Sequence, residues 1–300
     1  MDKELKSLTD GLGESTIKSY EGSYKRLRKV LELTDKRKPI RKLDLKIILE
    51  KIDEIKNPST RHSVMVITKK IFPYNDDNKE LYDPIDERIK KDKRELQVAK
   101  NGSLDKELPS YKEIESAIKR ETDPRKYITS FIMFRINTRN QDIALIDLHK
   151  EPKDEYDKER NHLILDGNKV IFLRNKYKTF KKYGVKKNTI VVKKFIDMVK
   201  KLLGDKDNMK LFSRKNGEKI TESSIASYLK KYIVLGMNEG KIIKAVLKHA
   251  ADSQKSYEKI RKISNNRGTT TQVLLSEYDI SNVEEPSEII KNDKQKNIWC

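Results

Sequence analysis

The sequence predicts a mainly α-helical protein with a small three-stranded β-sheet, divided into a small helical domain and a larger mixed domain. Apolar residues recur at three- and four-residue steps along most of the chain, which is the period of an amphipathic helix. Short runs of aliphatic residues gather between residues 163 and 192 and indicate strands. A segment dense in charge, residues 84–107, separates the two parts and predicts a partly helical linker that Asn101-Gly102-Ser103 breaks.

The first 83 residues predict a helical domain with a basic surface. Ser15 or Thr16 can cap a first helix that extends to Leu31. Its outward positions carry Lys18, Lys25, Arg26, Arg28 and Lys29. A second helix is expected over residues 43–55, and Asn57-Pro58 ends it and begins a third. This domain therefore offers a cationic face.

Residues 108–280 predict the larger domain. Ser110 and Glu113 form a capping-box pattern at its first helix. The three strands are expected at residues 163–165, 170–173 and 189–192, the first two joined by the turn Asp166-Gly167-Asn168. Further helices are expected over residues 124–136, 195–203, 225–233, 241–249 and 257–263. Residues 281–300 are polar and are expected to form a C-terminal tail.

The charge of the chain points to a polyanionic partner. Lys and Arg number 67 against 47 Asp and Glu, which gives a net charge of +20. Nucleic acid is the first candidate and an anionic membrane surface the second. No apolar run of about 18 residues and no apolar N-terminal signal region is present, so we expect a soluble intracellular protein. The alternative explanation is a lysine-rich, solvated surface without a specific partner.

Few residues are suited to metal or redox chemistry. The one cysteine is Cys300, so neither a disulfide framework nor a cysteine-based zinc site is expected. The four histidines lie too far apart along the chain for a local metal motif. Glycine-rich phosphate loops and hydrolase motifs are also missing from the sequence. We therefore expect chemistry without a cofactor, and without a metal unless the substrate brings one.

Four segments in order carry candidate functional residues. The first places Arg139 after an apolar helix, with acids at Asp142 and Asp147. The second is a lysine-rich stretch, residues 175–184, between the second and third expected strands, with Lys178 near its middle. The third is Leu247-Lys248-His249, and the fourth runs from Arg267-Gly268-Thr269 to Tyr278.

In this order the segments resemble the tyrosine recombinase (phage integrase) family, and most closely the integrase-type recombinases of large DNA viruses and mobile elements. The resemblance implies a helical core-binding domain at residues 1–83 and a catalytic domain at 108–280. It implies site-specific DNA recombination through a 3′-phosphotyrosyl intermediate, on double-stranded DNA, by a dimer or tetramer assembled on that DNA. It also implies an intracellular location with DNA, in nucleus, cytoplasm or viral factory. The catalytic residues it implies are Arg139, Lys178, Lys248, His249, Arg267 and Tyr278.

Two departures from the family pattern leave alternatives open. Where the family has a His-x-x-Arg box, this chain has Ala245 and Lys248. An ammonium group keeps the charge but loses the two-pronged geometry with which arginine binds phosphate oxygens. A DNA-binding protein that has lost catalysis is therefore the alternative, and a basic packaging protein is a third class. Tyr257, eight residues after His249, competes with Tyr278 for the role of nucleophile.

Overall fold

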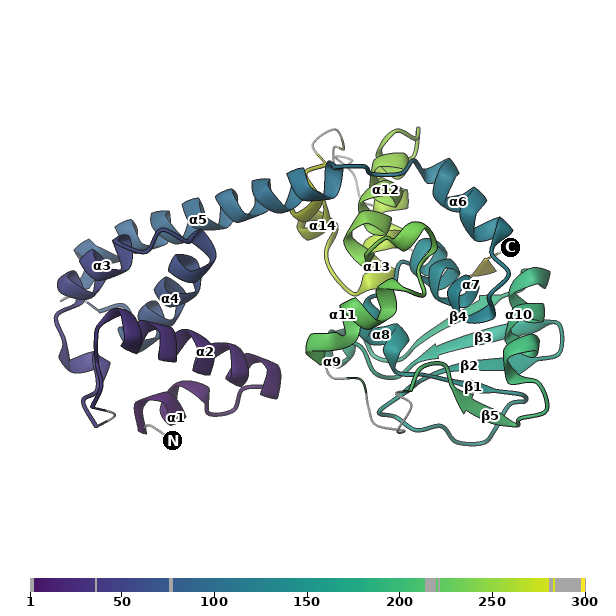
Figure 1. Ribbon diagram of the computed structural model, residues 1–300, viewed down its shortest axis with the longest axis horizontal. Coiled ribbons are helices and arrows are strands. Elements are labelled where there is room, and N and C mark those ends of the chain that lie inside the picture. The colour runs from purple at the N-terminus through teal and green to yellow at the C-terminus, as the bar shows by residue number, and fades with distance from the viewer. Residues whose placement is uncertain are drawn as a thin grey trace, which may run out of the picture. The chain divides into compact units, whose positions relative to one another are not determined.

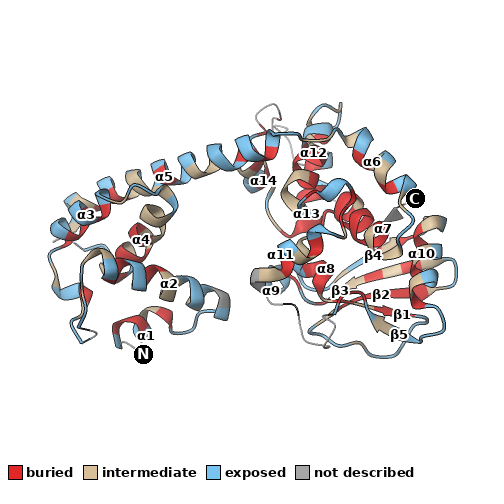
Figure 2. Cartoon of the chain, in the orientation of Figure 1, coloured by how far each residue is buried: buried red, intermediate tan, exposed pale blue. Residues whose placement is uncertain are grey.

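The computed structural model describes residues 3–35, 37–75, 78–213, 220, 222–280, 283 and 298–299. Most of the expected tail, residues 281–300, lies outside these ranges. The chain divides into two compact units, Met1–Ser103 and Leu104–Cys300. Each unit has a hydrophobic core of its own, and Figure 2 shows buried residues concentrated inside each.

The first unit is all-helical, as its periodicity predicted. Its helices are α1 (Lys3–Thr9), α2 (Glu14–Val30), α3 (Leu45–Asp53), α4 (Pro58–Ile71) and most of α5 (Lys79–Asp105), with a 3₁₀ turn at Ile40–Lys42. Asn57 caps α4 by accepting a hydrogen bond from the Thr60 amide at 3.0 Å. Leu27, Ile48 and Met65 are fully buried between the helices. The apolar stripes of α2, α3 and α4 therefore face one another across a shared core.

The linker predicted at residues 84–107 is instead part of one continuous helix. α5 has 27 residues, contains Pro84 and passes through Gly102 without a break. A glycine within a helix costs only about 1 kcal/mol, which tertiary contacts can outweigh. Here Leu104 enters the core of the second unit, and Asp105 forms an ion pair with Lys244. The boundary between the two compact units falls inside this helix, at residues 103 and 104, within the segment 84–107 that was expected to link the domains.

The sheet of the second unit is larger than predicted. The expected antiparallel strands are present as β2 (Asn161–Asp166), β3 (Lys169–Arg174) and β4 (Lys186–Ile190). In addition β1 (Ile146–His149) pairs with β2 in parallel, and β5 (Asn208–Lys210) pairs with β1. A two-residue strand, β6 (Ile298–Trp299), pairs with β4 at the other edge. The resulting mixed sheet has the order β5-β1-β2-β3-β4-β6, and Figure 1 shows β1–β5 lying side by side.

Helices pack around this sheet. They are α6 (Tyr111–Arg120), α7 (Pro124–Phe131), α8 (Asn140–Ala144), α9 (Phe180–Tyr183), α10 (Lys193–Leu203), α11 (Glu222–Lys230), α12 (Glu239–Ala251), α13 (Ser256–Arg267) and α14 (Thr271–Tyr278). The predicted capping box is formed, because Ser110 and Glu113 each accept a hydrogen bond from the other's amide. Within the described ranges, no helix combines the length and the apolar character needed to cross a membrane.

Candidate functional site

Arg139 stands at a sharp change of direction after a buried helix. α7 continues into a π-helical turn, Ile132–Ile136, and Asn137 then adopts a left-handed conformation with φ of 60°. π-Turns inside helices occur frequently at functional sites. The chain next passes through the buried Thr138 and starts α8 directly after Arg139. The apolar packing of the preceding helix therefore fixes the backbone position of Arg139, whose side chain is half-buried.

The C-terminal end of α13 contacts four side chains from distant parts of the chain. The carbonyls of residues 265–268 each accept a hydrogen bond from a different side chain. Lys186 donates to Asn265, Arg174 to Asn266 at 2.7 Å, Arg139 to Arg267, and Thr179 to Gly268 at 2.8 Å. The last carbonyls of a helix lack partners within the helix and carry partial negative charge, which attracts cations. The end of α13 thus brings two arginines and a lysine together.

A third guanidinium group joins them from α13 itself. Arg267 is 5% exposed and donates to Glu239 Oε1 at 2.6 Å. The other oxygen, Glu239 Oε2, accepts the amide hydrogen of Asn140 at 2.8 Å. Glu239 therefore joins the start of α8 to the end of α13 and holds Arg267 beside Arg139.

Cationic groups outnumber acids in this cluster. We define the arginine cluster as Arg139, Arg174, Arg267 and Lys186 with the acids Asp142 and Glu239. Arg174 is fully buried and lies 3.8 Å from Asp142. Burial raises the pKa of Asp142, against the effect of Arg174. Burial, assisted by the charge of Arg174, lowers the pKa of Lys186 to about 8. A surplus of positive charge in a partly dry site favours binding of an anion.

Several buried polar atoms around the arginine cluster have no hydrogen-bond partner within the described part of the chain. Native proteins leave few such atoms, and each calls for an explanation. Here they gather in one place, as is typical of a site built to bind something. The atoms are Asn137 Oδ1, Thr138 Oγ1, Asn140 Oδ1, Asp142 Oδ1 and Arg174 Nε.

Tyr278 lies close to this cluster. It is the last residue of α14, which Thr270 caps, and its side chain is 3% exposed. Burial raises the pKa of Tyr278 to about 12, while the positive charges of Arg267 and Arg139 act in the opposite direction. Tyr257 stands near the start of α13, ten residues before Arg267. At about 1.5 Å per residue it is roughly 15 Å away along the helix. The position of Tyr278 beside the cluster favours it over Tyr257 as a nucleophile there.

Three of the predicted site residues lie elsewhere. Lys178 is exposed in the loop between β3 and β4, and Lys186 at the start of β4 occupies the cluster instead. Lys248 forms an ion pair with Asp105 at 2.7 Å, and the ring of His249 stacks on that of Tyr111, with centroids 4.0 Å apart.

Helix geometry explains the position of Lys248 and His249. They stand nine and ten residues after Glu239 on α12. The helical rise places them roughly 13–15 Å along the axis from that end. Ala245, the other position of the degenerate box, is 4% exposed and packs in the core. The structure therefore does not bring the Ala245–His249 segment to the arginine cluster.

Sequence reasoning missed Arg174, Lys186 and Glu239 as site residues. For Arg174 a signal was available. Val170 and Phe172 point into the core, and Arg174 continues the same alternation. A charged residue at an inward position of a strand predicts a buried ionic site. Glu239 is the acid in the first turn of α12, a common position for acids, and no comparable local pattern singles it out.

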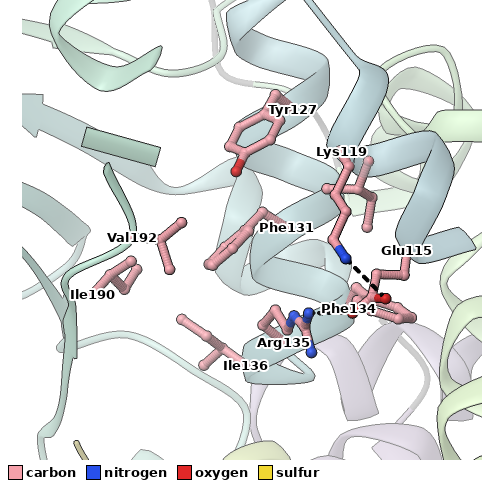
Figure 3. A pocket seen from close by; sticks show the side chains of 10 residues that line it. Glu115, Lys119, Tyr127, Phe131, Phe134, Arg135, Ile136, Ile190 and Val192 are labelled. Atoms are coloured by element: carbon pink, nitrogen blue, oxygen red, sulfur yellow. Dashed lines mark hydrogen bonds and ion pairs between the residues drawn. The ribbon is translucent and has the colours of Figure 1, made fainter. Parts of the chain in front are cut away.

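Two other features of the second unit bring together polar side chains or enclose a cavity. His149 Nε2 and His162 Nδ1 lie 3.0 Å apart on β1 and β2, but the described residues form no group of three or more metal-ligating side chains. A pocket of about 210 Å³ opens between α6, α7 and the end of β4 (Figure 3). Its charged groups are paired, because Glu115 contacts both Lys119 and Arg135. Its apolar lining suits packing better than phosphate chemistry.

The first unit carries a separate basic depression of about 1070 Å³. Glu4 lies at its floor, 5% exposed, and accepts hydrogen bonds from the Tyr24 hydroxyl and the Ile40 amide. The Glu4 carboxylate is therefore engaged in hydrogen bonds within the first unit. The basic side chains that line the depression are Lys3, Lys25, Arg28, Arg37, Arg41 and Lys42.

Comparison of the chain with family models, with curated proteins and with solved structures found no match. The resemblance to tyrosine recombinases therefore rests on the sequence segments alone. Chemically, the arginine cluster combines three guanidinium groups, an ammonium group of lowered pKa and a nearby phenol. Such a set can bind a phosphodiester through its non-bridging oxygens and offer it a nucleophile.

Proposed function

We propose that this protein is a DNA strand transferase of the tyrosine recombinase type, which cuts and rejoins DNA through a 3′-phosphotyrosyl intermediate. The observation that carries the proposal is the convergence of Arg139 with Arg267 and Tyr278, because Arg139 lies 128 residues before Arg267 in the sequence. All three residues are among those that the family resemblance implies. Lys186 takes the place expected of Lys178.

In the proposed reaction the Tyr278 hydroxyl attacks the scissile phosphorus. A bond forms between the tyrosine oxygen and phosphorus, and the phenolic proton leaves to solvent. The bond to the 5′ oxygen breaks, and that oxygen takes up a proton. Arg139 and Arg267 neutralise the charge that develops on the non-bridging oxygens. Lys186, with a pKa of about 8, is the proton donor for the leaving oxygen. The phosphotyrosyl bond conserves the phosphodiester energy, so the reverse steps rejoin a strand.

The proposed substrate is double-stranded DNA. The net charge of +20 and the basic depression of the first unit are the properties that binding to phosphate backbones requires. We further propose that two or four copies assemble on the DNA, because exchanging strands between duplexes needs more than one cut.

A second candidate function is DNA binding without catalysis. Two observations favour it. Arg139 and Arg174 already donate hydrogen bonds to the carbonyls of α13, and Tyr278 is nearly inaccessible. In that case the cluster stabilises the fold around α13, and only the basic surfaces contact DNA.

Covalent capture on DNA separates the two candidates. The protein is incubated with a pool of nicked duplexes of random central sequence, from which a cleaved segment dissociates. Protein–DNA adducts are then resolved by denaturing electrophoresis. We expect an adduct with the wild type and with Tyr257→Phe, and none with Tyr278→Phe, because only the latter removes the nucleophile. Tyr257→Phe is the matched control. If adducts persist with Tyr278→Phe and vanish with Tyr257→Phe, Tyr257 is the nucleophile instead. If DNA binds and no adduct forms, the second candidate holds.

A further inference from the structure

The β3–β4 loop, residues 175–185, exposes apolar side chains at its tip. The exposed fractions are 36% for Phe180, 37% for Tyr183 and 56% for Val185. Soluble proteins scatter exposed apolar residues singly, so three within six positions mark an interaction surface. Tyr183 is partly engaged, since the amines of Lys182 and Lys186 lie over its ring. The other two are Phe180, whose ring meets the Tyr177 ring edge-on with centroids 6.1 Å apart, and Val185, directly before β4. We call this pair the apolar tip.

The charged residues of the loop that surrounds this tip are all basic. Residues 175–190 contain no Asp or Glu. The lysines of this stretch are Lys176, Lys178, Lys181, Lys182, Lys186 and Lys187. Lys176 is paired with Glu159 from the neighbouring segment. A cationic surface with apolar and aromatic residues among the lysines fits a polyanion that also offers flat apolar groups, which is the chemistry of nucleic acid bases.

The loop is anchored to the arginine cluster. The Tyr177 hydroxyl donates to the Gly184 carbonyl at 2.7 Å and closes the loop at its base. The Thr179 hydroxyl donates to the Gly268 carbonyl at 2.8 Å, one residue after Arg267. A Cβ at Gly268 would approach Thr179 Oγ1 to 2.1 Å, so the loop and the end of α13 are in tight contact. The apolar tip is therefore held at a set position beside the site.

We propose that the β3–β4 loop is a wedge that contacts the bases of duplex DNA next to the phosphate bound by the arginine cluster. Phe180 and Val185 pack against a base step that opens or unstacks, and the lysines around them neutralise the flanking phosphates. Apolar side chains inserted at base steps in this way bend DNA and raise affinity where the step is deformable. This inference rests on the proposed function for its partner, and it adds contact with bases to contact with phosphates.

The test uses the full-length protein and duplexes with 2-aminopurine, a base whose fluorescence rises when it unstacks. The probe is placed at successive positions around a site obtained from the random-sequence binding pool. The wedge variants are Phe180→Ala and Val185→Ala. Val191→Ala is the matched control, because Val191 is 42% exposed but lies after β4, outside the loop. We expect a fluorescence rise at one step with the wild type and the control, and about tenfold weaker binding without that rise with Phe180→Ala.

Lysine variants distinguish base contact by the apolar side chains from electrostatic attraction to the phosphates. Lys181→Ala and Lys182→Ala should weaken DNA binding and its salt dependence but keep the fluorescence rise. The wedge proposal is overturned if the wild type binds DNA and the Phe180→Ala and Val185→Ala variants match Val191→Ala in affinity and in the fluorescence rise. The proposed function survives that result. Absence of any DNA binding by the wild type overturns both. Vesicles of anionic lipid are measured in parallel, and binding that Phe180→Ala weakens there but not on DNA assigns the loop to a membrane surface instead.

Discussion

At the scale of single residues, each cation of the site is positioned by a backbone carbonyl. Arg139 and Arg174 each use part of their guanidinium group on the end of α13. A guanidinium group has five hydrogens in a planar fork, so one or two bonds to carbonyls still leave donors for a ligand. Lys186 has a single amine and is held in the same way. The geometry of the cluster therefore exists before any anion binds.

The lowered pKa of Lys186 leads to a pH prediction. A proton donor with a pKa of about 8 is charged below that pH and neutral above it. We expect the single-turnover cleavage rate to fall about tenfold per pH unit above pH 8. Lys186→Met should lower the rate at pH 7 by about 10²–10⁴-fold, the usual contribution of a general acid. Rates on a nicked duplex, measured from pH 6 to 10, test both.

Lys178→Met is the matched control for Lys186, because Lys178 is exposed in the β3–β4 loop that precedes β4. At protein concentrations that saturate the DNA, it should leave the cleavage rate nearly unchanged. A duplex whose leaving 5′ oxygen is replaced by sulfur, which departs without a proton, should restore the rate of Lys186→Met. Loss of activity in Lys178→Met together with full activity in Lys186→Met would return the role to the lysine that the sequence first indicated.

At the scale of elements, the C-terminal end of α13 determines which side chains come together in the arginine cluster. Gly268 ends this helix in the left-handed region, with φ of 64°. Glycine is the residue that adopts this conformation without strain. The turn leads through Thr269 and Thr270 into α14. It leaves the carbonyls of residues 266–268 for side chains from Arg139, β3 and the β3–β4 loop, while the Asn265 carbonyl accepts both the Gly268 amide and Lys186. The wide separation of these partners, 79–128 residues in the chain, makes this a tertiary arrangement.

Gly268→Ala should therefore damage both stability and the site. The added Cβ would lie 2.1 Å from Thr179 Oγ1 and 3.2 Å from the Tyr177 ring, on a backbone that alanine disfavours. We expect a loss of about 2–4 kcal/mol in the free energy of unfolding. Gly11→Ala is the control, because Gly11 also has positive φ, 69°, but has open space at its Cβ, so only the strain of the backbone conformation applies there. Equal losses for the two variants in denaturant unfolding would show that the contact with Thr179 is unimportant.

At the scale of the molecule, the chain has two separate cores. One gathers residues from Leu5 to Ile85, and the other gathers residues from Leu104 to Val283. α5 contributes to both, because it begins in the first unit and ends at Asp105 in the second. Separate cores predict separate unfolding, since each unit can lose its packing while the other keeps it.

Matched core truncations test this independence. Ile48 and Ile128 are both fully buried, one in each unit. Each Ile→Ala change should cost about 2–5 kcal/mol. We expect Ile48→Ala to lower the calorimetric transition of the first unit alone, and Ile128→Ala that of the second alone. A single transition that both variants shift equally would mean that the chain unfolds as one cooperative body.

The sequence by itself determined the features that depend on near neighbours. The Ser110–Glu113 capping box, the antiparallel hairpin around Gly167 and the helical period of the first unit all formed as predicted. Helix caps and turns are set by residues within a few positions, and amphipathic stripes by the period of a single element. The same logic placed Arg139 after its buried helix. Whether Arg139 and Tyr278 act on DNA stays a prediction.

Only the tertiary structure decided which residues share the site. Packing made α5 continuous through Gly102, added β1 and β5 to the sheet, and brought Lys186 rather than Lys178 to the carbonyls of α13. Lys178 and Lys186 lie in the same basic stretch and look alike to any local pattern. They differ in which helix end they face, and that depends on contacts between segments about 80 residues or more apart. Such contacts form only when the whole unit folds.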